Sequence, residues 1–516
     1  MSRAIYALIF SLTWLTPVAL SQTPTTGDTK TTARSVSAQN ETRPVKAAEE
    51  CACESQVLPE ALAIVNGVRI TARDIEKATG ESVTRLQRQI IEARKRELDL
   101  LINSKLLAIE AKKRGMTTTK LLQQEVVAKV KPPTDLEAQT FYDQNKERIQ
   151  SSFIESREDI LRYLLDQRQR LEAKKFADGL RVASETRVHV TEVTPPRNES
   201  ERGRLLATIN GETITSGDVE DSLKPLIFDV QESVYKMRKD ELDLSVNDAL
   251  LVQEAQKRKV TTTALLDAEV KPKAVTEAQA RTFFEENKDR VSGDFAQTKD
   301  AIVRYLEQIE VRVAERAFVE KLRTAASIQT FLVAPESPVF SIGTVDQPSL
   351  GKVEAPVTLV IFTDFQCPSC AAIHPALERL VQEYGDKVRL VARDFPLSQH
   401  VEAFKAAEAA EAAREQGKYW EYVQLLMRNQ SALGMDKLKA YATELALDRP
   451  RFDSALESGK FAATVQRDID DGMKLRINAT PTVFINGRRV SAKSYEELKA
   501  SVEAAFKALP PKKSAE

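Results

Sequence analysis

The sequence predicts a multidomain protein in which mainly α-helical tandem repeats precede a C-terminal α/β domain with a helical insertion. Three observations lead to this expectation. At 516 residues the chain is long enough for two to four domains. Short motifs recur at a nearly constant spacing within residues 60–333. A Cys-Pro-Ser-Cys motif lies between an apolar strand pattern at residues 357–362 and an amphipathic helix pattern that runs to about Tyr384.

The composition fits packed domains. Apolar residues make up 42% and charged residues 29% of the chain, so this is not a disordered polymer. The formal net charge of -1 argues against nucleic-acid binding, which needs a basic surface.

The N-terminus, residues 1–21, has the pattern of a cleavable secretory signal peptide. Arg3 supplies a positive charge, residues 4–15 are apolar, and Ala19-Leu20-Ser21 has the small residues of a cleavage site. The apolar stretch is shorter than the roughly 20 residues of a spanning helix, which weighs against an uncleaved anchor. We therefore expect a periplasmic or otherwise extracytoplasmic protein in an oxidising compartment.

Residues 22–58 are expected to form a flexible leader, because they are rich in Thr, Ser, Pro and charge up to residue 50. Cys51 and Cys53 lie near its end. A disulfide in a C-x-C motif is strained and easily reduced, which favours an accessory redox pair. A metal site and a disulfide to a partner chain are the alternatives.

An internal duplication divides the next region into two modules, residues 59–194 and 204–333. Matches held in register over this length indicate a duplicated domain. The matching segments are 63–67 and 207–211, 97–100 and 241–244, and 117–119 and 261–263, all at an offset of 144 (207 − 63), and 162–164 and 304–306 at an offset of 142.

Each module begins with a short strand and an Asn-Gly turn, continues in long helices with one apolar face, and ends in a closing strand. We expect the closing strand, residues 187–193 or 329–333, to pair with the opening strand of its own module. The pattern resembles the chaperone domain of SurA-type and PrsA-type extracytoplasmic foldases, although the junctions are too short for a parvulin domain. The resemblance implies binding of unfolded polypeptide. A spacer or dimerisation scaffold is the alternative, which leaves a homodimer open.

Cys367 and Cys370 at a predicted helix start form a dithiol/disulfide couple. The first sulfur lies beside unpaired backbone N–H groups, and the helix dipole favours its thiolate. Pro368 suits the first turn because its missing N–H would have no partner there. The predicted chemistry is thiol–disulfide exchange, in which Cys367 attacks or is attacked and Cys370 resolves the mixed disulfide.

No metal and no cofactor beyond the redox-active Cys367–Cys370 disulfide are expected. A structural zinc ion needs four ligands. The chain has four cysteines and three histidines, and the other two cysteines lie in the polar N-terminal segment. A purely structural disulfide would not call for the Thr-Pro strand found more than a hundred residues later.

Three segments of the C-terminal part form a pattern: Phe365-Gln366-Cys367-Pro368-Ser369-Cys370, Phe395-Pro396-Leu397 with His400, and Thr480-Pro481-Thr482-Val483-Phe484-Ile485-Asn486-Gly487. This pattern resembles the DsbA-type thiol-disulfide oxidoreductases. The resemblance implies a thioredoxin fold over residues 335–509, with a helical insertion at about 400–475 and a loose tail at 510–516. Within the insertion we expect helices at about 402–416, 419–428, 436–445 and 450–475.

The same resemblance implies the roles of further residues and the partners. Pro481 is then a cis-proline that faces the sulfurs, Thr480 presents its backbone to an extended substrate peptide, and Pro368 and Ser369 contact the substrate. The implied partners are unfolded or cysteine-containing exported proteins and a membrane redox partner of the DsbB-like or VKOR-like kind.

The sequence departs from this family at two points. Many relatives carry a buried acid about six residues before the first cysteine, where this chain has Ile361 and the nearest acid is Asp364. Proton transfer at Cys370 is therefore assigned to water, to Asp364 or to another acid. The Pro-Ser dipeptide also lacks the histidine of the most strongly oxidising relatives. An oxidase is the leading hypothesis, and a disulfide reductase or isomerase and a non-enzymatic holdase chaperone are the alternatives.

Overall fold

The computed structural model describes residues 51, 58–149, 151–288, 291–491 and 494–509. The chain divides into two compact units. The described part of the first unit lies within residues 91–229 and 336–509, and that of the second within residues 51–90 and 230–335. The predicted signal peptide and Cys53 lie outside the described residues. Among the helices described, none has the length and apolar character that crossing a bilayer requires.

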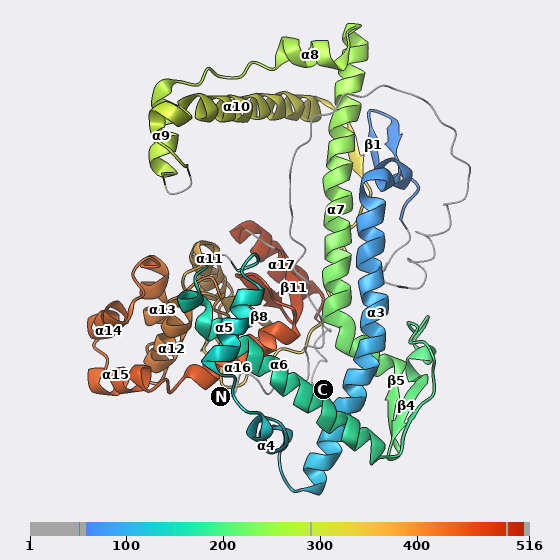
Figure 1. The fold of residues 1–516 in the computed structure, drawn as a ribbon. Coiled ribbons are helices and arrows are strands. Elements are labelled where there is room, and N and C mark those ends of the chain that lie inside the picture. The colour runs from blue at the N-terminus through green and yellow to red at the C-terminus, as the bar shows by residue number, and fades with distance from the viewer. Residues whose placement is uncertain (1–50, 52–57, 150, 289–290, 492–493, 510–516) are drawn as a thin grey trace, which may run out of the picture. The chain divides into compact units, whose positions relative to one another are not determined.

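Two long helices, α3 (Ala72–Lys113) and α7 (Ser216–Arg258), form the framework of the N-terminal part (Figure 1). In the first unit, apolar residues of α3 such as Leu98 and Ile102 pack against the first turns of α7. A buried ion pair accompanies this contact: Arg94 Nε lies 2.6 Å from Glu220 Oε1. In the second unit, the start of α3 packs against the later turns of α7. The two helices therefore run antiparallel.

Two small antiparallel sheets flank these helices, one in each unit. In the first unit the order is β3-β4-β5, and in the second it is β2-β1-β6. The strands are β1 (Ala63–Val65), β2 (Val68–Ile70), β3 (Thr186–Val188), β4 (Leu205–Ile209), β5 (Glu212–Thr215) and β6 (Ile328–Thr330).

The expected pairing of each closing strand with the opening strand of its own module is wrong. β3 closes the first module but pairs with β4 of the second, and β6 closes the second module but pairs with β1 of the first. The length of α3 explains the exchange. The helix that precedes β3 contacts α3 near Asp99, and at 1.5 Å per residue this lies about 40 Å along α3 from its start, where β2 ends. The strands of the second module are therefore the ones with which β3 can pair.

The shorter helices of the N-terminal part begin where the sequence offers a capping side chain. Thr117 caps α4 and Thr261 caps α8, which explains why a run of three threonines stands at each of these helix starts. Thr134 and Thr276 start α5 and α9 with capping boxes. The bounds are α4 (Thr118–Glu125), α5 (Asp135–Gln144), α6 (Phe153–Val182), α8 (Thr262–Glu269), α9 (Glu277–Glu286) and α10 (Phe295–Ala325), with 3-10 turns η1 (Val127–Lys129) and η2 (Ser200–Gly203).

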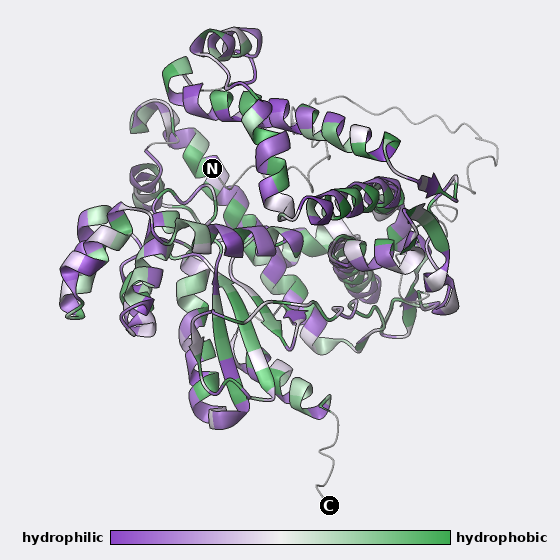
Figure 2. Cartoon of the chain, turned by 90° about the horizontal axis from the view of Figure 1, so that it is seen from below, coloured by the Kyte–Doolittle hydropathy of each residue, from purple (hydrophilic) through white to green (hydrophobic). Residues whose placement is uncertain are grey.

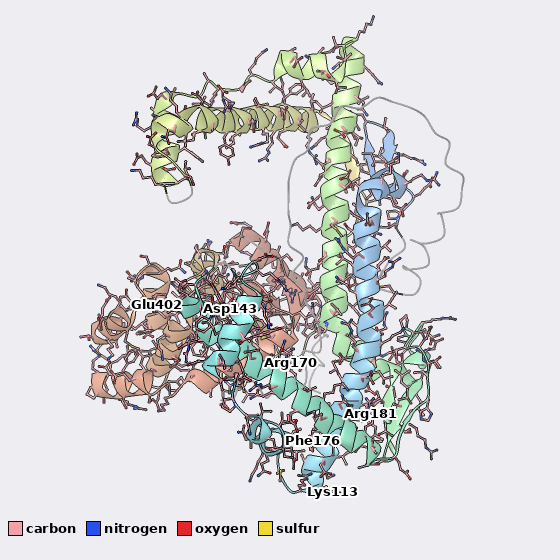
Figure 3. The ribbon with its side chains drawn as sticks, in the orientation of Figure 1. Lys113, Asp143, Arg170, Phe176, Arg181 and Glu402 are labelled. Atoms are coloured by element: carbon pink, nitrogen blue, oxygen red, sulfur yellow. The ribbon has the colours of Figure 1, made fainter. Side chains whose placement is uncertain are left out.

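The same side-chain contacts recur at matching positions of the two halves. Arg181 near the end of α6, labelled in Figure 3, donates to Asp99 and Asn103 of α3. Arg323 near the end of α10 donates to Asp243 and Asn247 of α7. In each half, the closing helix is thus tied to the long helix of the same half, although its strand joins the other sheet.

The C-terminal part contains a five-stranded sheet in the order β11-β10-β8-β9-β7. β8 and β9 are parallel and are joined through helix α11, whereas the other pairs are antiparallel. Both faces of β8 are buried, and the strands are largely green in Figure 2. The elements are β7 (Ser349–Leu350), β8 (Val357–Thr363), α11 (Pro368–Tyr384), η3 (Gly385–Lys387), β9 (Val388–Asp394), β10 (Thr482–Ile485), β11 (Arg488–Val490) and α17 (Tyr495–Lys507).

A helical insertion lies between β9 and β10. The single helix expected at residues 450–475 is two helices, because Gly459 adopts φ +64 and the Lys460 N–H turns back to the Ala455 carbonyl. The other expected insertion helices are present with small shifts at their ends. The helices are α12 (Ala403–Arg414), α13 (Tyr419–Arg428), α14 (Met435–Glu444), α15 (Arg449–Glu457) and α16 (Ala462–Lys474).

A cluster of buried carboxyl groups joins the insertion to β9. It consists of Asp394, Glu411 and Asp468, all nearly inaccessible. Arg393 pairs with Asp468, and Arg414 pairs with Glu411. Neither oxygen of Asp394 has a hydrogen-bond partner among the described residues. Burial first, and then the neighbouring charges of Glu411 and Asp468, hold the pKa of Asp394 well above its usual range.

We expect Asp394→Asn to stabilise the protein at neutral pH. The folded wild type keeps this proton, while the unfolded chain loses it above about pH 3.9, so its stability falls as pH rises above that value. The asparagine cannot ionise, so its gain in the free energy of unfolding should be present at pH 7 and vanish below about pH 4. Urea unfolding at several pH values measures the gain.

Asp471→Asn is the matched control. Asp471 accepts hydrogen bonds from Arg393 and Lys474, and these lower its pKa against the opposing effect of burial. Its replacement should destabilise the protein at neutral pH. If Asp394→Asn and the wild type had the same free energy of unfolding at every pH, the raised pKa of Asp394 would be wrong.

Candidate active site

The two cysteines of the motif lie where strand β8 passes into helix α11. Cys367 is the N-cap residue of α11, and Cys370 lies in its first turn. The Cys367 N–H donates to the Asp364 carbonyl at 3.1 Å, and the Cys370 N–H donates to the Cys367 carbonyl at 3.0 Å. Both are free thiols. Both residues are buried, but Cys367 keeps 7% of its surface exposed and Cys370 none.

The Thr-Pro segment meets Cys367 across the sheet. β10 pairs with β8, with Thr482 opposite Phe362, and this register brings residues 480 and 481 to the end of the strand that carries the dithiol. The Thr480–Pro481 peptide bond is cis, as the resemblance implies. The Cys367 Sγ donates to the Thr480 carbonyl oxygen at 3.2 Å. The carbonyl before the cis-proline thus faces the more exposed sulfur.

Burial sets the protonation state of the resolving thiol, Cys370. It raises the pKa of Cys370 to about 12, against the smaller effect of the Asp364 N–H, which lies 3.5 Å from its sulfur. Cys370 therefore keeps its proton at neutral pH. Buried His374 lies on the same helix, with Nε2 3.1 Å from Thr363 Oγ1. Burial lowers the pKa of His374 to about 4, so the ring is neutral at pH 7 and adds no positive charge.

A fully buried carboxylate, that of Asp364, organises the loop before the dithiol. Its Oδ1 accepts from the Gln366 N–H at 2.7 Å. Its Oδ2 accepts from the Leu397 N–H and lies 2.7 Å from His400 Nδ1. The nearest acid found in the sequence is therefore in place beside the dithiol, and its oxygens bind the loop and the Phe-Pro-Leu segment.

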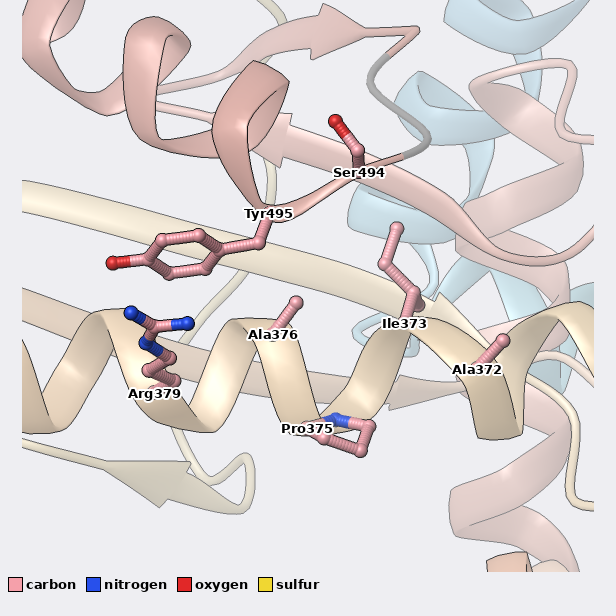
Figure 4. Close-up of a pocket in the computed structure, with 7 residues that line it drawn as sticks. All are labelled: Ala372, Ile373, Pro375, Ala376, Arg379, Ser494 and Tyr495. Atoms are coloured by element: carbon pink, nitrogen blue, oxygen red, sulfur yellow. The ribbon is translucent and has the colours of Figure 1, made fainter.

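The other two motif residues and a neighbouring pocket lie on the outer side of α11. Pro368 and Ser369 are exposed. Farther along the helix, a pocket of about 350 Å³ lies between α11 and the start of α17 (Figure 4). The guanidinium of Arg379 stacks on the Tyr495 ring at 3.9 Å. The lining residues are Ala372, Ile373, Pro375, Ala376, Arg379, Ser494 and Tyr495.

Sequence reasoning missed Gln430, which reaches the dithiol loop from the insertion. Its Nε2 donates to the carbonyls of Phe365 and Cys367. A glutamine after a helix, in a segment without a motif, gives no signal that would single it out.

The accessory pair predicted at the leader is only partly described. Cys51 is buried and disulfide-bonded, and it belongs to the second unit. Cys53 lies outside the described residues. Within the part of the chain that is described, no group of three or more His, Cys, Asp or Glu side chains has the arrangement of a metal site.

Residues 343–504 match the model of a thioredoxin family. The C-terminal part is therefore a thioredoxin-like domain, with a dithiol at the start of its first long helix.

The curated relatives that match are bacterial Na⁺/H⁺ antiporters of the NhaA type. NhaA 3 of Salinispora tropica is 42% identical over 158 residues, which are 30% of this chain and 24% of that protein. NhaA 1 of Mycolicibacterium gilvum is 38% identical over 142 residues, 27% of this chain and 23% of that protein. The chain thus spans about a quarter of the length of these relatives, and the match covers only its thioredoxin-like region.

Two similar solved structures each cover about a third of this chain. BdbD of Bacillus subtilis is 25% identical, with 34% of this chain and 100% of that chain covered at a TM-score of 0.31. A thioredoxin-like oxidoreductase of Silicibacter pomeroyi DSS-3 is 30% identical, with 32% and 95% covered at a TM-score of 0.30.

The different surroundings of the two thiols predict selective alkylation. With a pKa of about 12, only about one Cys370 in 100,000 is a thiolate at pH 7. Brief treatment of the reduced protein with iodoacetamide should therefore modify Cys367. By peptide mass spectrometry, the alkylation of Cys370 should be at least about a hundredfold slower. Cys370 should become reactive in urea. Equal rates in the folded protein would contradict this difference.

Proposed function

We propose that the protein is an exported thiol-disulfide oxidoreductase that acts on cysteines of secreted or envelope proteins. The observation that carries the proposal is the pairing of Cys367, which faces the Thr480 carbonyl at the cis-proline and keeps 7% of its surface exposed, with a Cys370 that keeps none. This arrangement gives one sulfur to the substrate and keeps the other as an internal partner.

The proposed reaction starts from the Cys367–Cys370 disulfide. A substrate thiolate attacks the Cys367 sulfur, which forms a mixed disulfide and releases the Cys370 sulfur, which takes up a proton. A second substrate thiolate then attacks the substrate sulfur of the mixed disulfide and releases Cys367. The substrate is oxidised by two electrons, and the protein disulfide is reduced to the dithiol. Once released, Cys370 takes up a proton because its pKa is high, and a protonated thiol is slow to attack back.

The substrate segment would lie extended across the cis-proline. Thr480 offers backbone groups beside Cys367, and Pro368 and Ser369 are exposed next to the sulfur. The pocket in Figure 4 would accept an apolar side chain farther along the segment.

The N-terminal modules are proposed to hold unfolded polypeptide, as the SurA-like resemblance implies. Large apolar side chains on their shorter helices are exposed: Leu136 of α5 by 76% and Ile154 of α6 by 87%. On α10, Val313 is also exposed. Such side chains among many charges fit transient binding of apolar segments.

The proposed cycle needs a partner that restores the disulfide. The partner class is a membrane oxidase of the DsbB-like or VKOR-like kind, and the proposed compartment is the periplasm or another extracytoplasmic space. Cys51 and Cys53 are proposed as an accessory redox pair. The same dithiol run in the opposite direction would make a reductase or isomerase, and a protein that only binds unfolded chains would be a holdase.

The reduction potential of Cys367–Cys370 decides between the two directions. We expect a value near about -120 mV, typical of strong oxidants, after equilibration in glutathione buffers. Cys51 and Cys53 are replaced by Ser so that one couple is measured. A value near about -270 mV would exclude the oxidase and favour the reductase or isomerase.

Cys367→Ser separates an enzyme from a holdase. The variant should lose disulfide formation in a reduced, unfolded model substrate, because the attacked sulfur is missing, yet still suppress its aggregation. Cys51→Ser with Cys53→Ser is the control and should keep both properties. Aggregation suppression without any cysteine-dependent oxidation by the wild type would leave the holdase as the function.

A further inference from the structure

Two glutamine side chains join the helical insertion to the dithiol loop, one from each side: Gln430 of the insertion and Gln366 of the loop. From the insertion, the Gln430 side chain uses its amide nitrogen to donate to the Phe365 carbonyl at 3.0 Å and to the Cys367 carbonyl at 2.8 Å. From the loop, Gln366 Oε1 accepts from the Glu402 N–H at 2.7 Å, one residue before α12. The thioredoxin-like core and its insertion therefore meet at the cysteines through reciprocal hydrogen bonds.

The Cys367 carbonyl is the acceptor that closes the first turn of α11. It receives the N–H of Cys370 at 3.0 Å and that of Ala371 at 3.2 Å. Pro368 has no N–H, so the peptide between Cys367 and Pro368 has no donor of its own. Gln430 supplies a further donor to the same carbonyl and fixes the plane of this peptide.

The orientation of this peptide matters for the charge on sulfur. The first-turn N–H groups of a helix stabilise a thiolate at its N-terminus, and the stabilisation falls off within about one turn. A rotation of the Cys367–Pro368 peptide would change where the Cys367 sulfur lies relative to this end of the helix. A glutamine suits this place because it donates without a charge, whereas a carboxylate would repel both carbonyls and the thiolate.

We propose that Gln430 is a positioning residue through which the helical insertion stabilises the Cys367 thiolate and so sets the oxidising strength of the dithiol. The inference rests on the proposed thiol–disulfide exchange. If so, the insertion is part of the redox centre as well as a set of helices between β9 and β10.

Two substitutions of nearly the same shape test the proposal. Gln430→Met keeps the length of the side chain and removes both donors. Gln430→Glu keeps the shape and replaces the donors by a carboxylate. The control is Gln424→Met on α13, because Gln424 Nε2 donates to Glu378 of α11 at 3.0 Å and so ties the same elements together away from the dithiol loop.

The readouts are the glutathione equilibrium and the pH dependence of Cys367 alkylation, with Cys51 and Cys53 replaced by Ser throughout. In Gln430→Met, oxidation by glutathione disulfide should become roughly tenfold more favourable, a potential about 30 mV more negative. The alkylation midpoint should move to higher pH. In Gln430→Glu both changes should be larger, because a glutamate is ionised at neutral pH. Gln424→Met should match the wild type in both readouts.

A purely structural role predicts something else: a lower melting temperature with an unchanged equilibrium and an unchanged alkylation profile. That result would overturn the proposal. If Gln430→Met does not fold, Gln366→Met decides, because it removes the reciprocal acceptor of the Glu402 N–H and should shift the equilibrium in the same direction. No shift in that variant would also overturn it. A wild type that never exchanges with glutathione would instead refute the proposed function itself.

Discussion

The buried carboxylate of Asp364 is the contact on which the redox centre depends. It binds the Gln366 N–H on one side and the Leu397 N–H with His400 on the other. Its own backbone carbonyl accepts from Cys367, and its N–H approaches the Cys370 sulfur. One residue therefore sets the loop that carries both sulfurs and ties it to the segment after β9. A buried charge is costly unless its oxygens are bound, and here that requirement fixes the conformation.

The sequence was sufficient for those parts of the site that depend on local chemistry. The dithiol and the start of α11 follow from Cys-Pro-Ser-Cys because a helix start is a property of a few adjacent residues. The cis bond before Pro481 was implied by the family resemblance of the Thr-Pro segment. The full burial of Asp364 and the reach of Gln430 are not local. They depend on β8, the loop and the insertion meeting in space, and no spacing along the chain announces such a contact.

The same distinction explains the fold. The long helices of the two modules were foreseen, because their apolar face recurs along the sequence. The break between α15 and α16 was missed, because a helical periodicity continues on both sides of Gly459 and does not mark the left-handed backbone of that residue. The strand exchange was missed for a different reason. A repeat predicts that two modules have the same elements, but it does not say which copy completes which sheet when a helix as long as α3 separates the ends.

The exchanged strands also impose an order on the growing chain. Asn210 binds the Glu185 N–H, 25 residues away, whereas Asn66 binds the Ser327 N–H, 261 residues away. Closing the longer loop costs about 2 kcal/mol more in chain entropy. The sheet of the first unit is complete once β5 has been synthesised, and the hairpin β1–β2 waits for β6. The first strands to leave the ribosome, β1 and β2, are thus among the last to complete their sheet. The strand that completes it, β6, is synthesised immediately before the thioredoxin-like domain.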